Sequence, residues 1–154
     1  VVEEERPEGG EHSGNGALVP QTRSTESYMT SLRANDPHLV ELDLGCVALG
    51  DAGATELAGA LRVNSFLLDL YLGSNALGDV GATELAGALR VNSSLRELHI
   101  RYNWLQDAGA TELAAALRVN SSLRSLRLEG NELEFGGKEA LRIAWGVRGG
   151  GLRL

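Results

Sequence analysis

Two series of polar and aromatic residues recur in this sequence at intervals of 28 positions. The first column consists of three acids and a serine: Glu41, Asp69, Glu97 and Ser125. The second column mixes charged and aromatic residues: Asp43, Tyr71, His99 and Arg127. Carboxylates in a row attract cations or a basic protein surface, a histidine near acids can exchange protons, and aromatic rings beside arginine are typical of protein interfaces. These residue types allow a catalytic site, a metal site or a protein-binding surface.

The spacing of these residues supports neither catalysis nor metal binding. His99 has acids nearby in the columns. The candidate nucleophiles Ser74 and Ser125 lie in the 28-residue intervals before and after the one that contains His99, and neither stands in a GxSxG motif. The three histidines and the single cysteine lack the spacing of metal ligands. A calcium ion needs six or more oxygen ligands, and the acids that open the two columns are too few. We therefore expect a protein that is not an enzyme and that binds no cofactor and no metal.

The acids of the first column favour a partner with a basic surface. If successive residues of this column lie on neighbouring parallel strands, they are about 4.8 Å apart. Each adjacent pair of carboxylates then repels by about 0.8 kcal/mol at the dielectric of water. A basic partner would remove this repulsion. The alternative is an acidic surface that serves only solubility. The formal net charge of −7 also argues against nucleic acid as a partner.

A group of large residues stands out in the second and third copies of the repeat. It comprises Tyr71, His99, Arg101, Tyr102 and Trp104, in a chain with only 5% aromatic residues. Glycine or alanine occupies several corresponding positions in the simpler copies, so packing does not require the larger side chains. Because exposed rings and arginine often anchor protein interfaces, we expect this group to bind a partner. The alternative is that Trp104 packs as a local lid over the start of the next helix.

The columns need strands to display them, and the sequence supplies four repeat units. The copies begin at Leu39, Leu67, Leu95 and Leu123. In each copy, apolar residues at alternate positions predict a short strand, and segments such as ATELAGALRVN then predict an amphipathic helix. The expected N-caps of these helices are Asp51, Asp79 and Asp107. One strand and one helix cannot enclose a core alone, so the copies must stack.

The pattern LxxLxLxxNxL, followed by GDxGA and a helix, resembles leucine-rich repeats of the ribonuclease-inhibitor-like subtype, which is also common in NOD-like receptors. The resemblance covers about residues 25–154. It implies an α/β leucine-rich repeat solenoid in the form of a short horseshoe arc, with a parallel sheet on the concave side and helices on the convex side. It also implies a binding scaffold, without specifying the partner.

An asparagine follows three of the four strands, at Asn75, Asn103 and Asn131. Its amide is expected to satisfy backbone groups of the turn that leaves the strand. Val47 replaces it in the first copy, where we expect a looser or a dry turn. The resemblance also implies an alternative function, because some proteins with this repeat subtype activate small GTPases through residues on the rim. On that analogy, Arg101 and Asn103 are the candidates for acting on a GTPase.

A tail and one repeat domain are expected along the chain. Residues 1–24 contain five glutamates, two arginines and almost nothing that could be buried, which is typical of a disordered acidic tail. This tail is either a linker or a docking segment for a basic partner. Residues 25–154 form the repeat domain, with a degenerate N-terminal cap helix at 25–38, repeats at 39–66, 67–94, 95–122 and 123–150, and an incomplete fifth strand at 151–154.

The C-terminal end lacks the polar cap that closes a solenoid. No aspartate precedes the fourth repeat helix, and the last three residues look like the opening of a further strand. We expect an end interface with another chain, formed by Leu126, Leu128, Trp145, Leu152 and Leu154. The alternative is that Leu152 and Leu154 fold back over the end as a lid.

Cys46 is the single cysteine, so the disulfide-closed caps of many secreted repeat proteins cannot form within this chain. We expect it to fill space rather than to react. No apolar run approaches the roughly 20 residues that a membrane span requires, and a signal-peptide pattern is absent from the N-terminus. We therefore expect an intracellular, cytoplasmic protein-protein interaction module, acting as a scaffold or as a subunit of a larger complex.

Overall fold

The computed structural model describes residues 23–154 as an alternation of helices and strands. The helices are α1 (Thr25–Arg33), α2 (Gly50–Leu61), α3 (Asp79–Leu89), α4 (Asp107–Leu117) and α5 (Phe135–Trp145). The strands are β1 (Glu41–Asp43), β2 (Asp69–Tyr71), β3 (Glu97–His99), β4 (Ser125–Arg127) and β5 (Leu152–Arg153). The predicted tail, residues 1–24, lies outside the described residues except for its last two positions.

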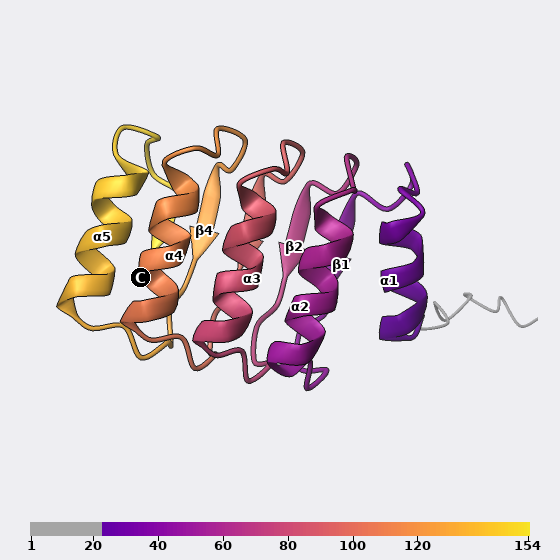
Figure 1. Cartoon of the computed structure of the whole chain (residues 1–154), viewed down its shortest axis with the longest axis horizontal. Coiled ribbons are helices and arrows are strands. Elements are labelled where there is room, and N and C mark those ends of the chain that lie inside the picture. Colours follow the sequence, from indigo (N-terminus) through magenta and orange to yellow (C-terminus); the bar gives the residue numbers. More distant parts are fainter. Residues whose placement is uncertain (1–22) are drawn as a thin grey trace, which may run out of the picture.

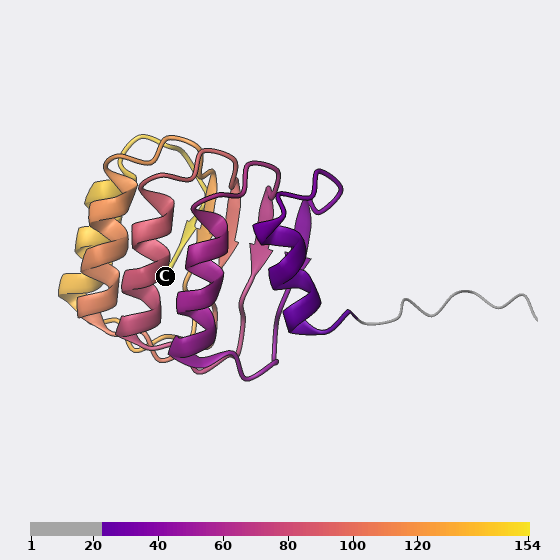
Figure 2. The same ribbon diagram turned by 45° about the vertical axis from the view of Figure 1, so that its right-hand side comes forward.

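The strands form one parallel sheet in the order β1-β2-β3-β4-β5. Figures 1 and 2 show α2 to α5 side by side in one layer, with the strands in a second layer behind them. The predicted α/β solenoid, with helices on one side and a parallel sheet on the other, is confirmed. No helix of the described chain combines the length and the apolar character that crossing a membrane requires.

The core is a thin layer of leucine and alanine between the sheet and the helices. The central leucines of the strands, Leu42, Leu70, Leu98 and Leu126, lie in register and are buried. The alanines that face them from the middle helices, including Ala58, Ala86 and Ala114, are buried as well. Because alanine is small, the helix backbones can approach the sheet closely. No single copy could bury these faces without its neighbours.

The aspartates at the helix starts cap the helix of the following copy, which corrects the prediction that each caps its own. Oδ1 of Asp51 accepts hydrogen bonds from the backbone N–H groups of Gly78 and Gly81, at 2.8 and 2.9 Å. Asp79 makes the equivalent bonds to the start of α4, and Asp107 bonds to the start of α5. Each aspartate lies inside the first turn of its own helix, so its carboxylate reaches sideways to the next helix. For this reason α5 is capped although no aspartate precedes it.

A glycine at the start of each later helix makes this close contact possible. An ideal Cβ built on Gly109 would lie 2.6 Å from Oδ1 of Asp79 and 2.9 Å from Cβ of Ala82. Gly81 and Gly137 meet the same kind of contact with the aspartate of the preceding copy. Only a residue without a side chain fits these three positions with the neighbouring helix in place.

Two glycine-to-alanine substitutions are therefore expected to change stability in opposite directions. Gly109→Ala should lower the free energy of unfolding by about 1 to 3 kcal/mol, because the added methyl group overpacks the contact with Asp79. Gly59→Ala should raise it by about 0.5 to 1 kcal/mol, because alanine is the better helix former and the new methyl group meets no atom within 4 Å beyond its chain neighbours and the nearby backbone of its own helix. Ala115 already occupies the corresponding position of α4. Urea unfolding measures both changes, and a gain from Gly109→Ala would show that the helices do not depend on this contact.

The asparagines that follow the strands satisfy backbone groups, as their position predicts, and they also join neighbouring copies, which was not predicted. Oδ1 of Asn103 accepts hydrogen bonds from the N–H groups of Asn75 and Leu77 in the preceding copy, at 2.9 and 3.0 Å. Its Nδ2 donates to three backbone carbonyl groups. In the first copy, the N–H of Val47 donates to Oδ1 of Asn75 at 3.1 Å. The turn at Val47 is thus held from the second copy and is not loose.

A second row of asparagines lies at the opposite edge of the sheet, where the chain passes from helix to strand, and was not predicted. Its members Asn64, Asn92 and Asn120 are buried. The amide of Asn92 donates to two carbonyl groups of the preceding copy and accepts from the N–H of Leu95 before the next strand. In the last copy Arg148 occupies this position, and its guanidinium donates to the carbonyl groups of Leu117 and Asn120 in the preceding copy and of Leu123 in its own. Both edges of the solenoid are therefore tied from copy to copy.

The C-terminal end is covered by its own chain. β5 pairs with β4 through hydrogen bonds of 2.8 Å from the N–H groups of Leu126 and Leu128. Leu126, Leu128 and Trp145 are buried, so the prediction that they face solvent and meet another chain is wrong. The glycines of residues 149–151 let the chain turn back, with a φ of 86° at the first of them. Leu152 and Leu154 are half-buried against the core, and their part in an end interface stays a prediction.

Candidate functional site on the concave face

The register of the sheet places the two predicted columns side by side. The first column runs across the sheet through Glu41, Asp69, Glu97 and Ser125. The second column runs through Asp43, Tyr71, His99 and Arg127, and the sheet adds Arg153 next to Arg127. Both columns alternate with the buried leucines, so their side chains face away from the helices. The predicted arrangement of these residues is confirmed by the pairing, while their role in binding stays a prediction.

Among the described residues, the acids at the β1 and β2 end of the face have no basic partner. Glu41 and Asp43 are exposed and Asp69 is half-buried, and no salt bridge within residues 23–154 involves any of them. Burial and, next, the charges of four nearby carboxylates, Asp69 first, raise the pKa of Tyr71 above its ordinary value of 10.0. The Tyr71 hydroxyl therefore stays protonated at neutral pH and sits in a negative field.

A shallow concave cavity of about 240 Å³ opens on this face. It brings together five of the predicted binding residues: Asp43, Tyr71, His99, Arg101 and Tyr102. The rest of its lining consists of small residues: Gly45, Cys46, Gly73 and Ser74. Gly45 and Gly73 follow β1 and β2 and have no side chains, so the space beside these strands stays open. At the equivalent position after β3 the chain has Arg101. This step from small to large residues is the signal in the sequence that could have revealed the cavity.

His99 forms a wall of the concave cavity and is not a displayed binding group. Its ring meets the ring of Tyr71 edge on, with centroids 4.7 Å apart and an angle of 77°, and only 9% of the residue is exposed. Nε2 lies 3.4 Å from Oε2 of Glu97, but the direction does not suit a hydrogen bond, and Nε2 has no such partner among the described residues. Burial and then the charge of Arg127 lower the pKa of His99 below 6.5. The imidazole is therefore neutral at neutral pH.

Tyr102 is held in an exposed position by the backbone and by its neighbour. Its φ of 55° is left-handed, as is that of Cys46 and Ser74 at the corresponding positions of earlier copies. The ring lies against Gly130, where an added Cβ would collide with it. Even so, 63% of Tyr102 is exposed. A ring that is already fixed loses little freedom when a partner covers it.

Trp104 stands apart from the concave cavity. It is 64% exposed and does not line the cavity, while its backbone N–H donates to the carbonyl group of Leu77 at 2.8 Å. This exposure also rules out a packed lid over the start of α4. The predicted aromatic group thus divides into four residues at the cavity and one on the adjoining turn.

Asn103 is not available to a partner. Only 2% of it is exposed, and its amide makes five hydrogen bonds to the backbone. A residue buried in this way cannot reach the nucleotide of a GTPase. Of the two residues suggested for that alternative function, only Arg101 lies on the surface of the concave cavity.

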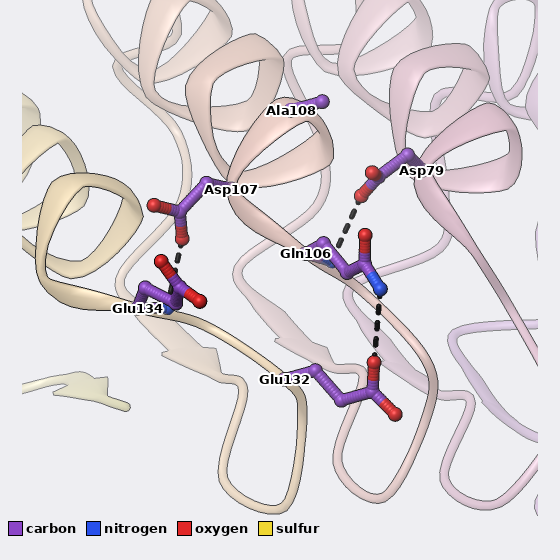
Figure 3. Close-up of a pocket in the computed structure, with 6 residues that line it drawn as sticks. All are labelled: Asp79, Gln106, Asp107, Ala108, Glu132 and Glu134. Carbon is purple, nitrogen blue, oxygen red and sulfur yellow. Dashed lines mark hydrogen bonds between the residues drawn. The ribbon is translucent and has the colours of Figure 1, made fainter.

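A larger cavity, of about 370 Å³, lies between the starts of α4 and α5 (Figure 3). Its lining is mostly acidic: Asp79, Gln106, Asp107, Ala108, Glu132 and Glu134. Asp79 and Asp107 accept hydrogen bonds from the backbone N–H groups of Gln106 and Glu134, and Nε2 of Gln106 donates to Glu132 at 3.0 Å. Because most of these carboxylates already cap backbone or side-chain donors, we assign this cavity a structural role.

Three segments of the sequence match a family model described as Leucine Rich repeat: residues 35–58, 63–86 and 91–114. The structure is similar to that of the leiomodin-1 actin-binding site 2, with a TM-score of 0.69, 16% identity, and coverage of 79% of this chain and 87% of that one. It is also similar to the C-terminal domain of tropomodulin from Caenorhabditis elegans, with a TM-score of 0.72, 20% identity, and coverage of 79% and 75%. Among curated proteins, none matches the sequence. At these identities the two solved structures share the fold with this chain, and no more follows from them.

Proposed function

This chain is a leucine-rich repeat protein with repeats of the ribonuclease-inhibitor-like type, and we propose that it is a non-enzymatic module that binds another protein through its concave face. The observation that carries this proposal is the concave cavity. There, two tyrosine rings and an arginine lie beside carboxylates that have no basic partner within the described chain. The proposal retains the predicted binding residues of both columns except His99, which forms a buried wall of the cavity, and adds the small residues of the cavity.

The anchors of the proposed interface are Tyr71, Arg101 and Tyr102. Tyrosine and arginine are enriched among the residues that dominate binding energy at protein interfaces. Tyr71 is braced by His99, and Tyr102 is fixed against Gly130. A partner that enters the cavity would therefore meet rings that are already in place, at a small cost in side-chain entropy.

The convex face differs in a way that favours the concave face as the interface. Between neighbouring helices, three arginine-glutamate pairs link α1 to α2, α2 to α3 and α3 to α4, at 3.5, 3.4 and 3.1 Å. Six charged residues of the convex face are thus matched within the chain. On the concave face the carboxylates of β1 and β2 are left for a partner.

Tyr71→Ala combined with Arg101→Ala should weaken binding of a partner by about 2 kcal/mol or more, which is roughly 30-fold in Kd. The reason is the loss of one ring and one guanidinium from the centre of the cavity. Immobilised wild type and variant can be compared for the proteins that they capture from a cell lysate, and the affinity of each captured protein is then measured by calorimetric titration.

A matched control is the convex variant Glu56→Ala with Glu84→Ala, which removes two exposed side chains on the helices. We call Tyr71→Ala with Arg101→Ala the concave variant. Proteins that bind wild type and this control with equal affinity, but no longer bind the concave variant, support the proposal. If the concave variant keeps the same partners with the same affinity, the concave cavity is not the interface.

Actin is the first defined protein to assay, because the structurally similar leiomodin-1 domain is described as an actin-binding site. Co-sedimentation with actin filaments and fluorescence titration with monomeric actin cover both of its forms. Binding that is lost in the concave variant and kept in the convex control would name actin as the partner. If the concave variant binds actin with the same affinity as wild type, the result counts against the proposed face.

A further inference from the structure

The charges of the concave face change sign from one end of the sheet to the other. The face carries Glu41, Asp43 and Asp69 on β1 and β2, with no basic residue among the positions that the two strands display. At the opposite end, Arg127 on β4 and Arg153 on β5 are neighbours in the second column. The second column therefore begins with a carboxylate, passes through two rings and ends with two guanidinium groups.

The residues that directly precede β1 to β4 form another row across the sheet, and in this row too the arginines lie toward the β4 end. Its members are Val40, Leu68, Arg96 and Arg124. Backbone hydrogen bonds of 2.7 to 2.8 Å link each of these residues to the next, so they are true neighbours across the sheet. All four side chains are exposed. The row is apolar beside the acids and basic beside the arginines of the second column.

These charges are separated and not paired with one another. No salt bridge within the described chain involves Arg96, Arg124, Arg127 or Arg153. Glu129, which follows β4, keeps Oε2 buried. Three strand spacings of about 4.8 Å place β1 roughly 14 Å from β4, which exceeds the screening length of about 8 Å at physiological ionic strength. The acidic end and the basic end therefore do not neutralise each other.

Adjacent residues in the middle of the second column sense opposite fields. After burial, the largest influence on the pKa of Tyr71 is the carboxylate of Asp69, which raises it. After burial, the largest influence on the pKa of His99 is the guanidinium of Arg127, which lowers it. The next largest charge at His99 is the carboxylate of Glu97 on β3, which acts in the opposite direction, so the sign changes gradually across β3, beside the concave cavity.

We infer that the concave face recognises a dipolar segment of its partner, with basic side chains over β1 and β2 and acidic side chains over β4 and β5, and so binds it in one orientation. This inference rests on the proposed function and refines the expectation of a partner with a basic surface, which suits only one half of the face. Reversing the segment would bring like charges together at both ends. Four strand spacings cover about 19 Å, which corresponds to roughly 13 residues of an α-helix.

The test uses the full chain labelled with ¹⁵N and a synthetic helical peptide of 13 residues. Three lysines occupy one half of the peptide and three glutamates the other, and a second peptide has the reversed sequence. A third peptide has the same composition with the charges alternating. A nitroxide attached to either end of each peptide broadens the amide signals of nearby protein residues. The signals of Leu44 and Gly45 report on the acidic end of the face, and those of Arg127 and Arg153 report on the basic end.

The expected result is that a nitroxide at the lysine end broadens the β1 signals and one at the glutamate end broadens the β4 and β5 signals. The two segregated peptides should bind about ten-fold more tightly than the alternating one at low salt. A variant with Asp43→Arg, Asp69→Arg, Arg127→Asp and Arg153→Asp should exchange the two broadening patterns. Equal broadening from both ends, or equal affinity for the alternating peptide, would overturn the inference.

The outcome is distinguishable from a failure of the proposed function. If captured proteins depend on Tyr71 and Arg101 but the peptides show no preferred orientation, the module binds through the cavity and the inference about polarity is wrong. If the peptides bind in one orientation but the captured proteins bind the Tyr71 and Arg101 variant as tightly as wild type, the inference about polarity is supported and the proposed role of the cavity is wrong.

Discussion

Replacing Asn103 by alanine is expected to lower the free energy of unfolding by about 4 kcal/mol. The substitution leaves the N–H groups of Asn75 and Leu77 without an acceptor, and each unsatisfied buried group costs about 1 to 3 kcal/mol. Bulk solvent does not reach these groups while the copies stay stacked, because Asn103 is almost completely buried. The loss is large since this one side chain joins two copies of the repeat.

Asn131→Ala is the matched control for this prediction. Asn131 belongs to the same row, but it is half-buried and its Oδ1 accepts only the N–H of Leu105 within the described chain. We expect a smaller loss, of about 2 kcal/mol. Guanidinium unfolding of both variants measures the difference. Losses below about 1 kcal/mol in both would mean that the asparagine row contributes little to stability.

Trp145→Ala is expected to lower the free energy of unfolding by about 3 to 5 kcal/mol, the usual range for a buried tryptophan. Trp145 is 4% exposed, and its Nε1 donates to the carbonyl group of Gly149 at 3.0 Å. The guanidinium of Arg148 lies 5.4 Å from the ring centroid. Removing the ring takes the support from the turn that returns the chain to β5. We therefore expect β5 to detach more readily and to expose Leu126 and Leu128.

Trp104→Ala provides the comparison, because it removes the same side chain from an exposed turn. Its effect on stability should stay within about 0.5 kcal/mol. Thermal unfolding ranks the two variants, and sedimentation velocity at increasing concentration shows whether the uncovered end of Trp145→Ala associates. If the two variants lost equal stability, the C-terminal end would not rely on its own chain for cover.

The repeat, the type of each element and the two columns of the concave face could all be predicted from the order of the amino acids. Alternation of apolar residues identifies a strand, and a period of 28 in that alternation fixes which residues of successive strands are neighbours. Glu41 therefore pairs with Asp69, and Asp43 with Tyr71, as the numbering alone predicts. The asparagine row that follows the strands could be predicted for the same reason, since its members also repeat every 28 residues.

The depth of individual side chains on the concave face was decided only by the tertiary structure. His99 and Tyr71 occupy equivalent positions in successive copies, yet His99 is buried and Tyr71 is half-buried. The ring of Tyr71 meets the ring of His99 edge on, with centroids 4.7 Å apart, and so covers one side of it. Periodicity predicts which face of the sheet a residue occupies. The size of its neighbours in other copies determines the exposed fraction of its side chain, and therefore how much of it a partner can contact.

Contacts between copies were likewise beyond the sequence pattern. Asp51 lies in the first turn of its own helix, yet it caps the helix that begins after Gly78, because stacking brings its carboxylate close to the start of the next helix. Leu126 and Trp145 carry no signal that distinguishes an open end from a covered one. Their burial depends on the turn back at residues 149–151, where glycine permits either direction of the chain and the apolar area buried against β4 and α5 favours the folded one.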